Sequence, residues 1–194
     1  ISGDPIASYV VGMILTSDYL RPKVVPDMDL AARHHAVASR ADFLPSVFQL
    51  GIMKVEGMLT EKDVEGGLDL LERAVSGNLP AAHHYMGLVH LNGKVLPENR
   101  EMALVHFQKA ADLGHAESML LTAEFYAFGI VSPVDLSLAK QYALRSANLK
   151  QPKAKGMLLE IESEIKSLSP AGSPPPPSSS IITDPTLADP PVAP

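Results

Sequence analysis

The sequence contains no cysteine and no tryptophan. The absence of cysteine excludes disulfides, thiolate metal sites, iron–sulfur clusters and thiol nucleophiles. No apolar run is long enough to span a bilayer, so membrane insertion is not expected. Lys and Arg number 16 against 22 Asp and Glu, which gives a net charge of −6. This acidic balance argues against nucleic acid, or an anionic membrane surface, as the main partner.

The remaining composition is that of a folded chain with a tail. The 194 residues are 46% hydrophobic, which suffices for a packed core in one or two domains. Residues 169–194 differ, because they hold 9 of the 17 prolines and no Lys or Arg. Such a segment buries too little apolar surface to offset the entropy of ordering. We therefore expect a disordered or extended Pro-rich tail after residue 168.

A repeat with a period of 36 residues runs through the chain before the tail. Several aligned columns differ in chemical character. The acidic or amide column is Asp27, Asp63, Asn99 and Asp135; the glycine column is Gly57, Gly93 and Gly129; the small columns are Ala31, Gly67, Ala103, Ala139 and Ala38, Ala74, Ala110, Ser146; the basic column is Arg73, Lys109 and Arg145.

Each column has a physical interpretation in a helix–turn–helix hairpin. The Asp/Asn column precedes an apolar-periodic run, where a short acceptor side chain caps a helix, here termed helix B. The basic column falls in the last turn of helix B, where the dipole favours cations. The glycine column ends the other helix, helix A, where the left-handed conformation suits glycine. Gly51 and Gly87 fall inside helix A, which indicates close approach to the small residues of helix B.

The predicted fold is therefore all-α: an α-solenoid of about four 36-residue hairpins with a C-terminal capping helix. The expected bounds are 1–9 for an N-terminal extension, 10–45, 46–81, 82–117 and 118–153 for the four units, 153–168 for the capping helix, and 169–194 for the tail. One apolar and one charged face over 153–168 is what a terminal cap needs.

The third unit carries a resemblance to a known family. Met86-Gly87, Gly93, Asn99, Ala103 and the run from Phe107 through Gly114 to Glu117 resemble a Sel1-like repeat, a relative of the tetratricopeptide class. The resemblance extends over about three quarters of the chain and is specific for architecture. It implies a right-handed superhelix used for protein–protein interaction, as an adaptor or assembly factor.

No catalytic signature accompanies the repeat. The sequence lacks a Gly-X-Ser-X-Gly elbow, a phosphate-binding glycine loop and a His-Glu-X-X-His motif. His83 and His90 share a helix face but lie about 10 Å apart at 1.5 Å rise per residue, too far for one metal ion. We therefore predict no enzyme activity, no cofactor and no metal site.

Three functions remain to be weighed. The first is a non-enzymatic interaction module that holds a partner on its concave, helix A surface, with Tyr85, His90, Glu124 and Tyr126 as the candidate contact residues. The second is an accessory structural subunit of a large, organellar complex, with the Pro-rich tail touching a neighbouring subunit. The third and most remote is a hydrolase. Related repeats that have been linked to hydrolase activity are cross-linked by cysteines, and this chain has none.

The chain begins at Ile1 rather than methionine, which is consistent with a removed leader or a shortened chain. A mitochondrial location after leader removal and a cytoplasmic one both stay open. The identity of the partner and the oligomeric state have no signal in the sequence.

Overall fold

The computed structural model describes residues 4–17, 25–59 and 62–168, and the predicted tail lies outside these ranges. Within them the chain forms helices and no strand. The helices are α1 (Pro5–Thr16), α2 (Met28–Arg40), α3 (Leu44–Val55), α4 (Val64–Ser76), α5 (Pro80–Asn92), α6 (Arg100–Asp112), α7 (Ala116–Phe128), α8 (Leu136–Asn148) and α9 (Ala154–Leu168).

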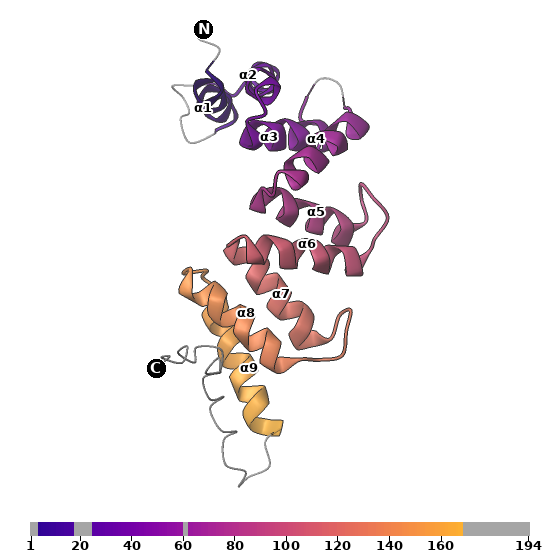
Figure 1. Ribbon diagram of the computed structural model, residues 1–194, viewed down its shortest axis with the longest axis vertical. Coiled ribbons are helices and arrows are strands. Elements are labelled where there is room, and N and C mark those ends of the chain that lie inside the picture. The colour runs from indigo at the N-terminus through magenta and orange to yellow at the C-terminus, as the bar shows by residue number, and fades with distance from the viewer. Residues whose placement is uncertain (1–3, 18–24, 60–61, 169–194) are drawn as a thin grey trace, which may run out of the picture.

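The helices form an α-solenoid, as the repeat predicts. Helices α1 and α2, α3 and α4, α5 and α6, and α7 and α8 pair as hairpins, and each hairpin packs on the next through consecutive helices. Figure 1 shows the hairpins stacked in sequence order, from α1 at one end to α9 at the other. The odd-numbered helices are the A helices of the repeat and the even-numbered ones are the B helices.

Two helix-end predictions are confirmed. Asp27, Asp63, Asn99 and Asp135 each accept a hydrogen bond of 2.9 Å from the backbone N–H three residues later, so each caps its B helix. Gly57, Gly93 and Gly129 have φ of 68°, 65° and 62°, the left-handed conformation expected after an A helix. The first helix begins at Pro5, inside the predicted extension 1–9, because Asp4 caps it through the N–H of Ile6.

The glycines inside the A helices do allow close packing. A Cβ built on Gly51 would lie 3.1 Å from the carbonyl oxygen of Gly67, so the backbones of α3 and α4 nearly touch there. In both repeats the same column of the B helix also faces this glycine, since a Cβ on Gly51 would lie 3.0 Å from Cγ of Leu71 and a Cβ on Gly87 would lie 2.5 Å from the ring of Phe107. A large B-helix side chain, rather than a small one, fills that space.

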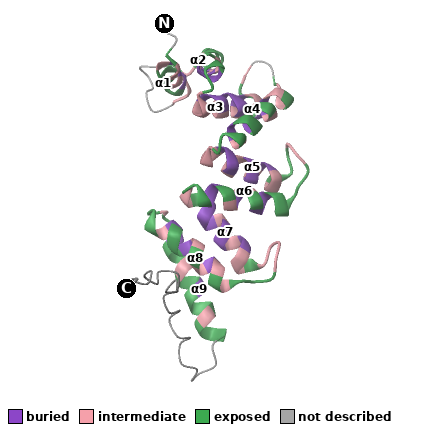
Figure 2. Cartoon of the chain, in the orientation of Figure 1, coloured by how far each residue is buried: buried purple, intermediate pink, exposed green. Residues whose placement is uncertain are grey.

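Small local cores hold successive repeats together. Val55, Leu71 and Met86 join α3, α4 and α5 in one cluster, while Phe107 and Phe125 belong to another between α6 and α7. Figure 2 shows the buried residues as a band that follows the stack of helices from one end to the other. Each repeat therefore depends mainly on its neighbours, as in other solenoids.

The turns between hairpins repeat a second backbone feature. Asp42, Asn78, Gly114 and Lys150, again 36 apart, all have positive φ, between 52° and 92°. We expect Gly114→Ala to lower the free energy of unfolding by about 1 kcal/mol, because an L side chain is strained at φ of 92°.

The control for this turn variant is Gly156→Ala in α9. Neither glycine has a heavy atom within 4 Å of an added Cβ, so the two substitutions differ in backbone conformation rather than in space. Gly156→Ala should raise stability by about 0.5 kcal/mol. Urea unfolding followed by circular dichroism measures both, and equal effects would contradict the backbone explanation.

Candidate functional site

One face of the A helices stays unburied through the stack. Residues at spacings of four, three and four on α3, α5, α7 and α9, or directly beside these helices, are all partly or fully exposed. We term this set the A-helix stripe: Pro45, Gln49, Ile52, Glu56; Ala81, Tyr85, Leu88, Asn92; Glu117, Leu121, Glu124, Phe128; Lys153, Met157, Glu160 and Glu164.

The stripe combines apolar side chains with an excess of carboxylates. Its large apolar members are Ile52, Tyr85, Leu88, Leu121, Phe128 and Met157, and its acids are Glu56, Glu117, Glu124, Glu160 and Glu164, against one cation, Lys153. Contacts join the stripe across repeats, because the hydroxyl of Tyr85 on α5 donates a 2.6 Å hydrogen bond to Oε1 of Glu56 after α3. The surface is therefore apolar at intervals and acidic, and a hydrogen bond joins its second and third repeats.

Two of the four predicted contact residues lie on this stripe. Tyr85 is half-buried, and burial together with the Glu56 carboxylate raises the pKa of its phenol, which keeps it a hydrogen-bond donor. Burial also raises the pKa of Glu124, while the ammonium of Lys153 acts in the opposite direction. Both side chains are placed where a partner on the A helices would meet them.

The other two contact B helices: His90 that of its own repeat, and Tyr126 those of its own and the preceding repeat. The His90 ring stacks on His106 of α6 at 5.6 Å, and its Nδ1 is buried without a hydrogen-bond partner. Tyr126 accepts a 2.5 Å hydrogen bond from Nε2 of Gln108, and its ring stacks on Tyr142 of α8 at 6.2 Å. Neither residue belongs to the stripe, although both stay partly exposed and Tyr126 borders a hollow that it shares with Val134 and Leu168.

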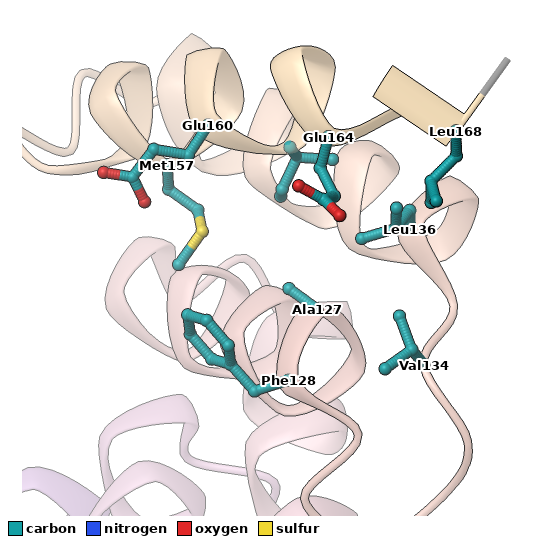
Figure 3. Close-up of a pocket in the computed structure, with 9 residues that line it drawn as sticks. Ala127, Phe128, Val134, Leu136, Met157, Glu160, Glu164 and Leu168 are labelled. Carbon is teal, nitrogen blue, oxygen red and sulfur yellow. The ribbon is translucent and has the colours of Figure 1, made fainter. Parts of the chain in front are cut away.

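A groove of about 350 Å³ opens at the C-terminal end of the stripe. It lies between α7, the segment from Gly129 to Asp135 and α9, and Figure 3 shows most of the side chains that line it. Three apolar side chains around it are largely exposed: Phe128 at 65%, Val134 at 57% and Leu168 at 67%. The sequence analysis chose Tyr126 as the aromatic contact residue of this repeat and missed Phe128.

The repeat columns contain the signal that would have revealed the groove. The position of Phe128 is Glu56 and Asn92 in the two preceding repeats, and the position of Val134 is Lys62 and Glu98. Both positions are polar in the second and third repeats and apolar in the fourth.

A second exposed apolar surface lies at the opposite end, on α1. Ile6, Val10, Met13 and Ile14 are between 36% and 58% exposed and, at helical spacing, share one side of a helix that contains no charged residue. Among the residues described, no helix is both long and apolar enough to cross a membrane.

The histidines gather in the third repeat. His83 and His106 approach to 3.3 Å between their Nδ1 atoms, and burial lowers the pKa of both rings. His84 lies 2.9 Å from the hydroxyl of Ser118, and its ring is 4.4 Å from that of His115. In the described part of the chain no group of three or more His, Asp or Glu residues is arranged to hold a metal ion.

These features define a class, the α-solenoids built from short helical hairpins. A family model for the Sel1 repeat matches residues 45–79, 80–115 and 116–150, which together cover more than half of the chain. The chain therefore belongs to the Sel1 repeat family, as the resemblance predicts. A search among curated proteins gave no match.

Solved structures agree on the fold. A Sel1 repeat protein from Oxalobacter formigenes is similar with a TM-score of 0.75 and 22% identity, over 87% of this chain and 67% of that one. The c5321 protein, a protective antigen present in uropathogenic Escherichia coli strains, is similar with a TM-score of 0.63 and 15% identity. That match covers 88% of this chain but only 42% of the antigen, so the chain spans less than half of that relative.

Proposed function

We propose that this chain is a non-enzymatic adaptor or assembly factor that holds a partner protein along the A-helix stripe. Sel1-repeat solenoids are generally scaffolds for protein–protein interaction. The observation that carries the proposal is the recurrence of the stripe, in which unburied apolar or aromatic side chains are found on every A helix from α3 to α9. Apolar anchors surrounded by polar groups are the anatomy of a protein interface.

The candidate residues take two roles in this proposal. Tyr85 and Glu124 touch the partner directly, because they lie on the stripe. His90 and Tyr126 fix the orientation of the A helices through their rings on His106 and Tyr142. Substituting the second pair is expected to weaken binding mainly through the fold.

Site-specific photo-crosslinking tests the proposed surface. Benzoylphenylalanine placed at Gln49 or Asn92 of the stripe should crosslink one partner protein in cells that express the chain. The same group at Glu101 or Val105, exposed on the B helix α6, should give no such product. In a Tyr85→Ser, Glu124→Gln background the stripe crosslinks should fall by at least about fivefold. Crosslinks only from α6 would refute the assignment to the A helices.

A second function, an accessory structural subunit of a large complex, is favoured by the apolar side of α1. That surface and the C-terminal groove lie at opposite ends of the stack, which suits a chain held between two neighbours. Crosslinks from Val10 and from Gln49 to two different proteins would support it. A contact of the tail 169–194 with a neighbouring subunit belongs to this candidate.

A further inference from the structure

We propose that the groove between α7 and α9 binds a short segment of a partner protein in which apolar side chains alternate with Lys or Arg. The proposal rests on the proposed function, because the groove continues the A-helix stripe through Phe128, Met157, Glu160 and Glu164. The proposal adds to that function where on the stripe the partner is bound most firmly and what kind of segment fills the groove.

The groove follows from how α9 packs. Ile161 of α9 is buried against the alanines Ala123, Ala139 and Ala143, whose small side chains let the centre of α9 approach closely. Beyond this contact two apolar side chains are left largely uncovered, Phe128 at 65% exposed and Val134 at 57%. Figure 3 shows α9 with its glutamates on one side and Ala127, Phe128 and Val134 on the other.

The charge around the groove selects its occupant. Glu160 and Glu164 are exposed, one helical turn apart, and neither carboxylate has a salt-bridge partner among the residues described. No Lys or Arg lines the groove. Two like charges at this spacing oppose each other on the helix, and a cation bound between them would relieve that repulsion.

The same charges disfavour the other occupants that the chain itself could supply. The tail contains an apolar pair, Ile181-Ile182, but it has no Lys or Arg and it carries Asp184 and Asp189. A second copy brings a net charge of −6. A basic, apolar segment of another protein is the occupant that matches both the apolar groups and the carboxylates.

Peptide binding to the full chain tests the proposal. The probe is a short fluorescein-labelled peptide of alternating leucines and lysines, measured by fluorescence anisotropy beside counterparts with glutamate for lysine and with serine for leucine. The leucine–lysine peptide should bind at least about tenfold more tightly than either counterpart, and more weakly as salt is raised.

Matched variants locate the binding. Phe128→Ala and Glu160→Gln with Glu164→Gln should each weaken binding about tenfold. Leu159→Ala removes a side chain that is 67% exposed on α9 away from the groove, and Glu65→Gln with Glu101→Gln removes the same charge from B helices. Neither control should change the dissociation constant. Equal losses in variants and controls would overturn the proposal, as would equal binding of the glutamate peptide.

The alternative occupants give their own results. An Ile181→Ser, Ile182→Ser variant that binds the probe much more tightly than the wild type would show that the tail fills the groove, and would overturn the proposal. A dimer in sedimentation that Phe128→Ala dissociates would assign the groove to a second copy. If no peptide binds while stripe crosslinks from Gln49 persist, the groove assignment fails and the proposed function stands.

Discussion

Phe107→Ala is expected to lower the free energy of unfolding by about 3–5 kcal/mol, the range for losing a fully buried aromatic side chain. Phe107 has no exposed surface and lies at the middle of the third repeat. Its ring packs edge-on against Phe125 at 5.8 Å, and the ring of His84 lies 5.9 Å away. Loss of the ring therefore removes contacts in its own hairpin and in the next one.

Combining Phe107→Ala with a substitution of Gly87, the glycine opposite its ring, tests this packing more sharply than Phe107→Ala alone. In the wild type, Gly87→Ala places a Cβ 2.5 Å from the ring, and overpacking of this kind costs about 1–3 kcal/mol. In the Phe107→Ala background the same Cβ enters the vacated space, so Gly87→Ala should be neutral or stabilising. The two substitutions are expected to couple by at least about 1 kcal/mol in a double-mutant cycle.

Urea unfolding of the four proteins, followed by circular dichroism, measures this coupling. Phe128→Ala is the control, since its ring is 65% exposed and its loss should cost well under 1 kcal/mol. If the effects of Gly87→Ala and Phe107→Ala on the free energy of unfolding are additive, the glycine is not required to make room for the Phe107 ring. A fall in the free energy of unfolding of less than about 1 kcal/mol for Phe107→Ala would contradict the burial of this ring in the core of the third repeat.

The helix ends could be predicted from the sequence, because the same capping residues and glycines recur at the same positions in several repeats. A cap at Asp63 or a left-handed glycine at Gly93 depends on backbone geometry within a few residues, and local chemistry determines it. The residues that pack against each other between helices were harder to predict. The repeat suggested a small residue opposite Gly87, whereas the structure places Phe107 there.

The candidate surface was predicted only in part, for a related reason. Tyr85 and Tyr126 are both aromatic and both on A helices, yet they sit five positions apart within the 36-residue repeat and face different neighbours. Residue type alone cannot separate them, but position within the repeat can. The groove depends on where α9 ends its contact with α7, which is a tertiary property that no single motif encodes.

Acid should destabilise the fold well above the pH at which carboxylates titrate. Burial, with smaller effects of His83 and His90, lowers the pKa of His106 to about 4. Burial likewise lowers the pKa of four other rings, those of His35, His83, His84 and His115. In the unfolded chain these groups bind protons near the ordinary histidine pKa of about 6.5.

The direction in which stability changes with pH follows from proton linkage. The unfolded state binds more protons than the folded state between pH 6.5 and the folded pKa, so stability is full above about pH 6.5 and falls as the pH drops below it. For His106 alone the loss by pH 5 is at most about 2 kcal/mol, because solvent screens a half-buried ring. Glu124 acts in the opposite direction, since burial raises its pKa.

Urea unfolding at pH 7.5 and pH 5.0 gives the measurement, and His106→Leu gives the matched variant. The second repeat has Leu70 at this position, so the repeat accommodates leucine there. The variant should lose less stability than the wild type on acidification, by about 1–2 kcal/mol. The same fall in both proteins would show that His106 is not held neutral by its burial. Because His106 contacts both His83 and His90 of α5, protonation of this one ring should open the α5–α6 hairpin before the repeats on either side.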